Sequence, residues 1–165
     1  MKKVAVIMGS DSDLSVVKSC IIVLKSLDIP VDVHIMSAHR TPHAATQFAE
    51  NAINSGYGII IAAAGKSAHL AGVIAANTTL PVIGIPIKSS TMDGLDSLLS
   101  TVQMPKGVPV ATVAIDGAEN AGILAAQILA LSEPELSQKL VNMKQKMAEE
   151  IKNKDLQIQV EVNKL

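Results

Sequence analysis

Two polar segments of the chain carry side chains that could bind a small anionic molecule and move protons on it. The first reads Gly9-Ser10-Asp11-Ser12-Asp13 and combines hydroxyls with carboxylates directly after an apolar run. The second reads Ser37-Ala38-His39-Arg40 and places a histidine beside an arginine. Arginine binds phosphate or carboxylate in a two-pronged geometry, and histidine transfers protons near neutral pH. Together the segments predict proton transfer on an anionic substrate.

The serine-rich segment has a structural interpretation as well as a ligand-binding one. Gly9 permits a tight turn, and Ser12 or Asp13 could simply cap a following helix. Alternatively, Ser10 and Ser12 bind a phosphate together with amides at the start of that helix. Asp11 or Asp13 would then accept hydrogen bonds from sugar hydroxyls, from an amine or from an imidazole N–H. Because a cap explains only one residue of the segment, we favour ligand binding.

A third polar segment reads Gly65-Lys66-Ser67-Ala68-His69. Its small residues permit a close approach of the backbone to a ligand, and His69 fits a structural role as well as a functional one. The segment resembles the end of a nucleotide-binding P-loop, but Ile60 stands where that motif needs its first glycine, which argues against an ATPase. The spacing of histidine, cysteine and carboxylate residues predicts no metal site.

Five apolar runs alternate with segments of helical spacing. These runs cover residues 4–8, 31–36, 58–63, 81–87 and 109–115. Continuous apolar runs are typical of strands buried on both faces of a parallel sheet. The order predicts an α/β protein, a three-layer α/β/α sandwich with a flavodoxin-like five-stranded parallel sheet. The polar segments, including Lys88-Ser89-Ser90, should then meet at the carboxyl edge of this sheet around one ligand.

Helix signals divide the chain further. Thr41-Pro42 predicts a helix start, Gly56 its end, and residues 118–131 another helix. Residues 1–132 are predicted to form the α/β catalytic domain. Residues 133–165 would add a C-terminal helix and tail, as part of that domain or packed on a neighbouring subunit, which we favour. The alternating tail at 156–162 could extend as an arm.

The composition excludes several classes of function. The 165 residues carry a net charge of -1 with one Tyr, one Phe and no Trp, which argues against binding to nucleic acid or to an anionic membrane. No apolar run reaches the roughly 18 residues of a membrane helix. A hydrophobic fraction of 48% predicts a homo-oligomer. The single cysteine, Cys20, fits a reducing compartment, so we expect a cytoplasmic protein.

The chain closely resembles the class I N5-carboxyaminoimidazole ribonucleotide mutases of the AIR carboxylase family. The resemblance covers roughly residues 3–130. It rests on "MGSDSD" at 8–13, "SAHRTP" at 37–42, "AGKSAHLAG" at 64–72, "LPVIGIP" at 80–86, "GLDSLLSTVQMPKGVPVATVAI" at 94–115 and "NAGILAAQIL" at 120–129.

This resemblance implies an isomerase of purine biosynthesis that uses no metal, ATP or organic cofactor. Its ribonucleotide substrate, N5-carboxyaminoimidazole ribonucleotide (N5-CAIR), becomes 4-carboxy-5-aminoimidazole ribonucleotide (CAIR). The implied assembly is a homo-octamer with active sites at subunit junctions. By the same resemblance, His39 transfers protons and Ser10, Asp13 and Arg40 bind substrate. The residues implied to line the site are Ser12, Ser37, Ala38 and His69.

The sequence departs from the family at three places. Leu14-Ser15 replace a frequent Trp-Pro, Lys66 stands at a usual Gly, and Ala71 stands at a usual Pro. Related class II enzymes carboxylate aminoimidazole ribonucleotide (AIR) directly with CO2, but the "SAHR" and "AHLAG" segments favour class I. Two further hypotheses stay open, a nucleotide-sensing module without catalysis and a structural protein that forms oligomers.

Overall fold

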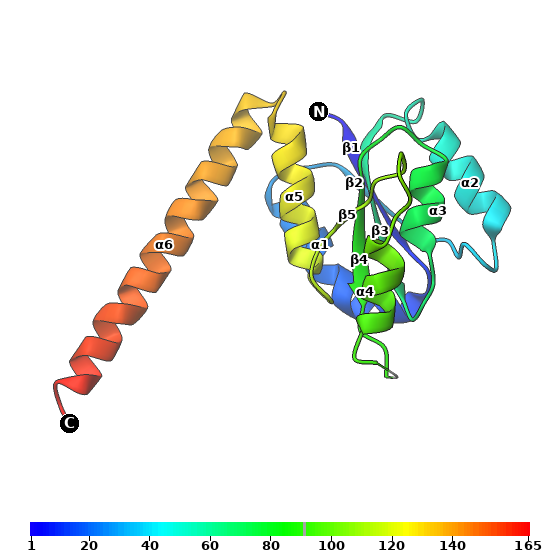
Figure 1. Ribbon diagram of the computed structural model, residues 1–165. Coiled ribbons are helices and arrows are strands. Elements are labelled where there is room, and N and C mark those ends of the chain that lie inside the picture. The colour runs from blue at the N-terminus through cyan, green and yellow to red at the C-terminus, as the bar shows by residue number, and fades with distance from the viewer. Residues whose placement is uncertain (91) are drawn as a thin grey trace.

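The protein, described here by a computed structural model for residues 1–90 and 92–165, has one parallel sheet at its centre. Its strand order is β2-β1-β3-β4-β5, and every neighbouring pair is parallel (Figure 1). The strands are β1 (Lys3–Met8), β2 (Val31–Ile35), β3 (Tyr57–Gly65), β4 (Val82–Ile87) and β5 (Ala111–Thr112).

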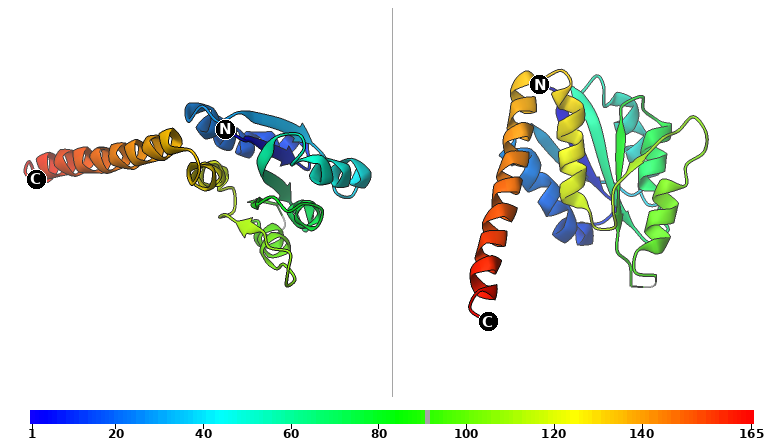
Figure 2. Two further views of the ribbon diagram at one scale, coloured as in Figure 1. Left: turned by 90° about the horizontal axis from the view of Figure 1, so that it is seen from above. Right: turned by 60° about the vertical axis from the view of Figure 1, so that its left-hand side comes forward.

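Helices cover both faces of this sheet, which confirms the predicted three-layer α/β architecture. The described helices are the 3-10 turn η1 (Asp11–Asp13), α1 (Leu14–Ser26), α2 (Pro42–Asn51), α3 (Leu70–Ala76), α4 (Leu95–Val102), α5 (Ala118–Ala130) and α6 (Pro134–Val162). Helices α1 and α5 lie on one face, and α2, α3 and α4 lie on the other (Figures 1 and 2). Alternate β1 residues join separate hydrophobic clusters on the two faces, Val4 and Val6 on one and Ala5 and Ile7 on the other.

The central and edge strands differ in burial. In β1, residues 4–7 have no exposed surface, as expected for a strand covered on both faces. The edge strand β2 leaves Val33 40% and Ile35 58% exposed, so the prediction of full burial was wrong there. The edge strand β5 is shorter than the predicted run at 109–115. It pairs with β4 at Ala111 and Thr112, two residues after Pro109, which has no N–H to donate to the sheet.

The predicted start of α2 is confirmed, but its predicted end was wrong. Thr41 occupies the N-cap position and Pro42 the first helical position. The helix ends at Asn51 rather than near Gly56. A turn follows, in which the Tyr57 N–H donates to the Ala52 carbonyl at 3.1 Å. Gly56 adopts φ 86° in this turn, where it directs the chain into β3.

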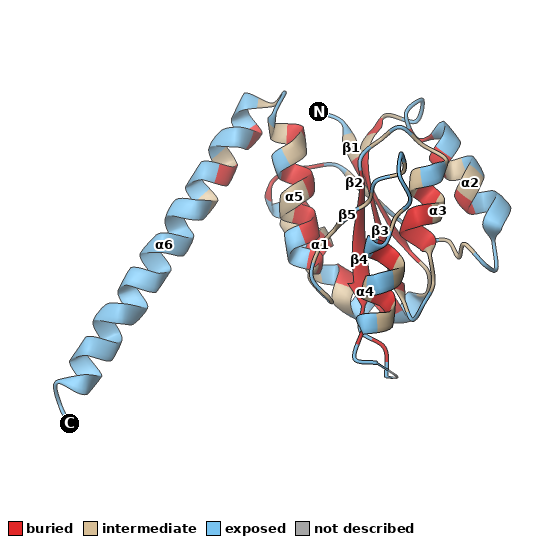
Figure 3. Cartoon of the chain, in the orientation of Figure 1, coloured by how far each residue is buried: buried red, intermediate tan, exposed pale blue. Residues whose placement is uncertain are grey.

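The first turns of helix α6 pack against the body, and Met143 adds a partly buried contact further along. Leu136 and Leu140 are buried, and Lys139 Nζ lies 2.7 Å from the Asp28 carboxylate. The rest of the helix projects away from the sheet and is mostly exposed (Figures 1 and 3). The predicted extended arm at 156–162 was wrong. No Gly or Pro interrupts this segment, so the helical hydrogen bonding continues through it.

Within residues 1–90 and 92–165, the structure contains no helix that combines the length and the apolar character needed to cross a membrane.

The close packing of α1 against α5 gives a test of the fold. A Cβ added at Gly122 would clash with Val23 Cγ1 and would lie 3.1 Å from the Cys20 carbonyl oxygen. We therefore expect Gly122→Ala to lower the free energy of unfolding by about 1–3 kcal/mol, despite the better helix propensity of alanine. Urea denaturation measures this change.

The matched control is Gln127→Ala on the exposed side of the same helix. Its free energy of unfolding should stay within about 0.5 kcal/mol of the wild-type value. A Gly122→Ala protein as stable as the wild type would show that α1 and α5 do not pack as described.

Candidate functional site

A cleft of about 440 Å³ opens at the carboxyl edge of β1, β2 and β3. Three turns form its walls, one after each of these strands. The lining residues are Gly9, Ser10, Ser12, Asp13, Ser37, Ala38, His39, Arg40, Ala64, Gly65, Lys66, Ala68 and Leu70. All predicted site residues except His69 therefore line one cleft, as expected from the parallel sheet.

The turn after β1 is a reciprocal helix cap. The Ser10 hydroxyl accepts from the Ser12 N–H at 3.3 Å, and the Asp13 carboxylate accepts from the Ser10 N–H at 3.2 Å. The Ser12 hydroxyl donates to the Ser10 hydroxyl at 2.9 Å, and the Ser10 hydroxyl donates to Asp11 at 3.1 Å. The N-cap is therefore Ser10, with Asp13 as its reciprocal partner, rather than Ser12 or Asp13 alone as the structural interpretation predicted. Both residues also line the cleft, so capping does not prevent contact with a ligand.

Asp13 is the buried carboxylate of this wall, with 7% of its surface exposed. Burial raises its pKa above the ordinary value, because leaving water disfavours the charged form. Hydrogen bonds from the Ser10 N–H and the Ser12 hydroxyl oppose this shift, and the nearby charge of Asp11 adds to it. Asp13 is thus fixed by the fold, with its position set before any ligand binds.

The turn after β2 holds His39 and Arg40 in the wall next to the β1 turn. The Ser37 hydroxyl accepts from the Arg40 N–H at 3.1 Å, and the Thr41 hydroxyl accepts from the Ser37 N–H at 2.9 Å. Arg40 also reaches the first wall, since its guanidinium donates to the Gly9 carbonyl at 2.9 Å. His39 and Arg40 are exposed, so both can meet a ligand that enters from solvent.

His69 lies behind the third wall and does not line the cleft. Its Nδ1 lies 2.6 Å from the Ser100 carbonyl oxygen of α4, which fits an Nδ1–H donor. Its ring also occupies the space of a side chain at position 72, because a Cβ on Gly72 would clash with His69 Nε2. The sequence allowed two roles for His69, and this placement supports the structural one.

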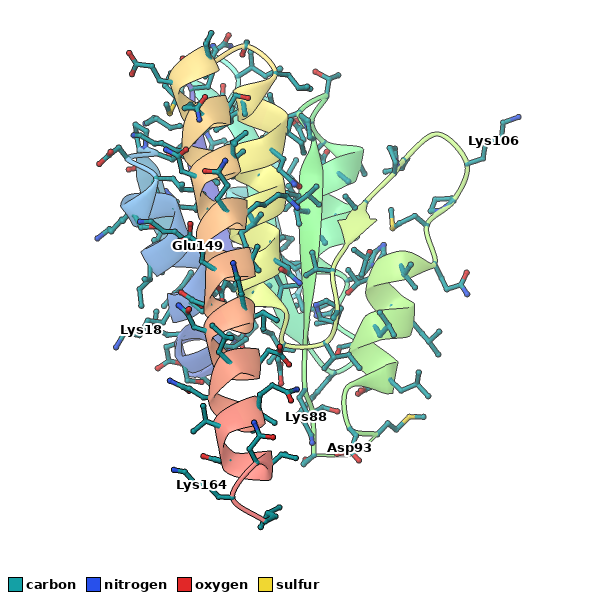
Figure 4. All side chains as sticks on the ribbon, turned by 90° about the vertical axis from the view of Figure 1, so that its left-hand side faces the viewer. Lys18, Lys88, Asp93, Lys106, Glu149 and Lys164 are labelled. Atoms are coloured by element: carbon teal, nitrogen blue, oxygen red, sulfur yellow. The ribbon has the colours of Figure 1, made fainter. Side chains whose placement is uncertain are left out.

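The end of β4 does not join the cleft, so the prediction for Lys88-Ser89-Ser90 was wrong. The Ser89 hydroxyl donates to the Asp96 carboxylate at 2.9 Å, and Lys88 Nζ lies 3.1 Å from the Asp93 carboxylate. Figure 4 shows Lys88 and Asp93 close together below α4. These polar side chains anchor the start of α4 instead of facing a ligand.

Six residues that line the cleft were absent from the predicted site residues, namely Gly9, Ala64, Gly65, Lys66, Ala68 and Leu70. The sequence left the orientation of Lys66 open, and Leu70 reads as an ordinary apolar helix residue. Among residues 1–90 and 92–165, no cluster of histidine, cysteine and carboxylate side chains is arranged to hold a metal ion.

The chain is similar to known proteins along most of its length. The AIR carboxylase family model matches residues 3–150. The N5-carboxyaminoimidazole ribonucleotide mutase of Thermotoga maritima is 53% identical over 154 residues, which cover 93% of this chain and 90% of that protein. The mutase of the same name from Mycobacterium tuberculosis is 49% identical over 163 residues, covering 99% and 94%.

A solved structure agrees with these sequence relatives. The crystal structure of Treponema denticola PurE matches with a TM-score of 0.84 at 27% identity, covering 92% of this chain and 95% of that one. The family match spans most of the chain, and the relatives align along nearly their whole length. This protein therefore belongs to the AIR carboxylase family.

Proposed function

We propose that this protein catalyses the isomerisation of N5-CAIR to CAIR in purine biosynthesis. The observation that carries this proposal is one cleft lined both by His39 and Arg40 and by the serine-rich turn after β1. The family and the names of its relatives give the reaction class, since the mutase from Thermotoga maritima is 53% identical to this chain.

The substrate would span the cleft between its walls. Ser10, Ser12 and Arg40 bind the phosphate, because hydroxyls and a guanidinium are suitable phosphate donors. Asp13 accepts hydrogen bonds from the ribose hydroxyls. Ser37 and Ala38 enclose the aminoimidazole ring. We assign His69 a structural role rather than a contact with substrate, since it contacts the Ser100 carbonyl and does not line the cleft.

The reaction then needs one proton-transfer group and no oxidant or reductant. The bond between the carboxylate carbon and N5 breaks, CO2 forms, and the nitrogen keeps the electron pair and takes a proton from His39. The ring carbon C4 attacks the CO2 and forms the new carbon–carbon bond. Neutral His39 then removes the proton from C4, so protons balance over the cycle. No metal or organic cofactor is required by this scheme.

Assembly into a homo-octamer is part of the proposal. Helix α4 turns a polar side chain toward the core and apolar side chains toward solvent. Ser97 is fully buried, whereas Leu95 and Leu99 are each 45% exposed. Together with Met92 and Val102 they form an exposed apolar strip, defined here as the α4 strip. Helix α6 also leaves Met147 and Ile151 more than half exposed. Neighbouring subunits would cover both surfaces, so that residues 133–165 pack on a neighbouring subunit.

The domain boundary and the cellular location follow from this function. Residues 1–132 hold every residue that lines the cleft, which supports their assignment as the catalytic domain. We also propose a cytoplasmic location, because the single cysteine, Cys20, is a free thiol in the core and an enzyme of nucleotide synthesis meets its substrates there.

The first prediction concerns the reaction itself. The purified protein should convert N5-CAIR to CAIR at a rate independent of added bicarbonate, because the migrating CO2 comes from the substrate. Chromatography of the two ribonucleotides measures this conversion. Product formed only from AIR and bicarbonate would indicate the class II reaction instead. Ribonucleotide binding without turnover would indicate a sensing module, and no binding of AIR would favour a structural protein.

The second prediction concerns His39. His39→Asn should retain substrate affinity within about threefold but lower kcat by about 10²–10⁴-fold, because asparagine cannot transfer the proton. Steady-state kinetics and calorimetric binding separate the two effects. His43→Asn is the matched control, since His43 is exposed on α2 outside the cleft, and it should leave kcat unchanged. Normal turnover by His39→Asn would refute the assigned role.

The third prediction concerns assembly. Leu99→Glu places a charge in the α4 strip and should reduce the octamer to smaller species in light scattering, with the helical content unchanged. Leu99→Met keeps the strip apolar and should preserve the octamer. Light scattering could contradict the proposed interface in two ways. The wild-type protein could be monomeric, or the Leu99→Glu protein could form an assembly of the same mass as the wild type.

A further inference from the structure

Lys66 stands in an unusual backbone conformation at the mouth of the cleft. It follows β3 in a tight turn that is closed by the Ala68 N–H donating to the Gly65 carbonyl at 3.4 Å. Its φ of 56° lies in the left-handed region, where a side chain meets the following carbonyl. The other described non-glycine residues with positive φ are aspartates, which tolerate this region better. A lysine here costs stability that a glycine would not.

The position of Lys66 in the cleft indicates a role for its side chain in ligand binding. It lines the cleft from the β3 side, whereas Arg40 lines it from the β2 side. Because β1 lies between β2 and β3, the serine-rich turn stands between the two cations. Arg40 donates to the Gly9 carbonyl, and among the described residues neither Arg40 nor Lys66 forms an ion pair with a carboxylate. Both cations can therefore meet an anion that enters the cleft.

We propose that Lys66 binds the migrating carboxylate of the substrate and product. This inference rests on the proposed function, in which the ligand carries a phosphate at one end and a carboxylate at the other. Arg40 and the serine-rich turn already supply donors for the phosphate. The remaining cation lies on the other flank, and an ammonium with three donors suits a carboxylate that changes its attachment point.

The chemistry of the reaction fixes where such a contact acts. The carboxylate is anionic in N5-CAIR and in CAIR but becomes neutral CO2 between them. Lys66 therefore stabilises the bound ground states more than the CO2 intermediate. Loss of the Lys66 charge should therefore raise KM and weaken the affinity for carboxylated ribonucleotides. The kcat of such a variant should be unchanged or slightly raised. Lys66 is thus a specificity residue that distinguishes carboxylated ligands from AIR.

Three variants test this role. Lys66→Met removes the charge and keeps an unbranched side chain of similar length and the backbone cost. Lys66→Arg keeps the charge. Lys66→Gly removes both the charge and the backbone cost. Calorimetry gives the Kd for CAIR, which has the carboxylate, and for AIR, which lacks it, while thermal unfolding gives Tm.

We expect Lys66→Met to weaken CAIR binding by about tenfold, the loss of one charge-assisted contact, and to leave AIR binding within about twofold. Lys66→Arg should bind CAIR like the wild type. Lys66→Gly should lose CAIR affinity as Lys66→Met does, yet raise Tm by about 2–4 °C, whereas the Tm of Lys66→Met should not rise. Gain of stability with loss of affinity is not expected for a solvent-facing lysine.

Several results would overturn the inference. Unchanged CAIR affinity in Lys66→Met would show that the ammonium does not meet the carboxylate. Equal loss of AIR and CAIR affinity would assign Lys66 to the phosphate instead. If the wild type binds CAIR and isomerises N5-CAIR, these results reject the role of Lys66 alone. If the wild type does neither, the proposed function fails and this inference fails with it.

Discussion

The parallel pairing of β1 with a strand on each side is the constraint on which the cleft depends. Met8 is in register with Ile35 of β2 and with Ala63 of β3, so β1 and β2 end at the same level of the sheet, while β3 continues beside them to Gly65. Gly9 is then tied to both neighbours. Its N–H donates to the Ala63 carbonyl at 3.0 Å, and its carbonyl accepts from Arg40 at 2.9 Å. A shift in this register would separate all three walls at once.

The same arrangement determines the charge of the cleft. Asp13 is buried at the centre, where loss of water raises its pKa and the hydrogen bonds of the cap oppose that rise. The cationic residues Arg40 and Lys66 stand on the two flanks. A ribonucleotide with two separated anionic groups would match the cations, while its uncharged sugar would lie over the central carboxyl. One fold element, the β1 turn, thereby serves as helix cap and as candidate ligand contact.

Features encoded locally could be predicted from the sequence, and those that depend on distant contacts could not. Apolar runs and the polar turns after them are local, and they indicated the sheet and most of the cleft. His69 differs because its partner, the Ser100 carbonyl, lies 31 residues away. Ser89 likewise follows a strand, but a carboxylate of α4 binds its hydroxyl. The alternating tail fits a strand pattern, yet it has no partner strand among the described residues to complete one.

The proposed chemistry also connects the cleft with the exposed apolar surfaces. Free CO2 must be retained beside the ring until C4 attacks it, which requires a cleft that excludes water. In the single chain, His39 and Arg40 are exposed, so the walls described here do not enclose the substrate by themselves. A neighbouring subunit would close the cleft if assembly placed it over these walls. If it also covered the α4 strip, assembly would bury the exposed apolar side chains and exclude water from the reaction together.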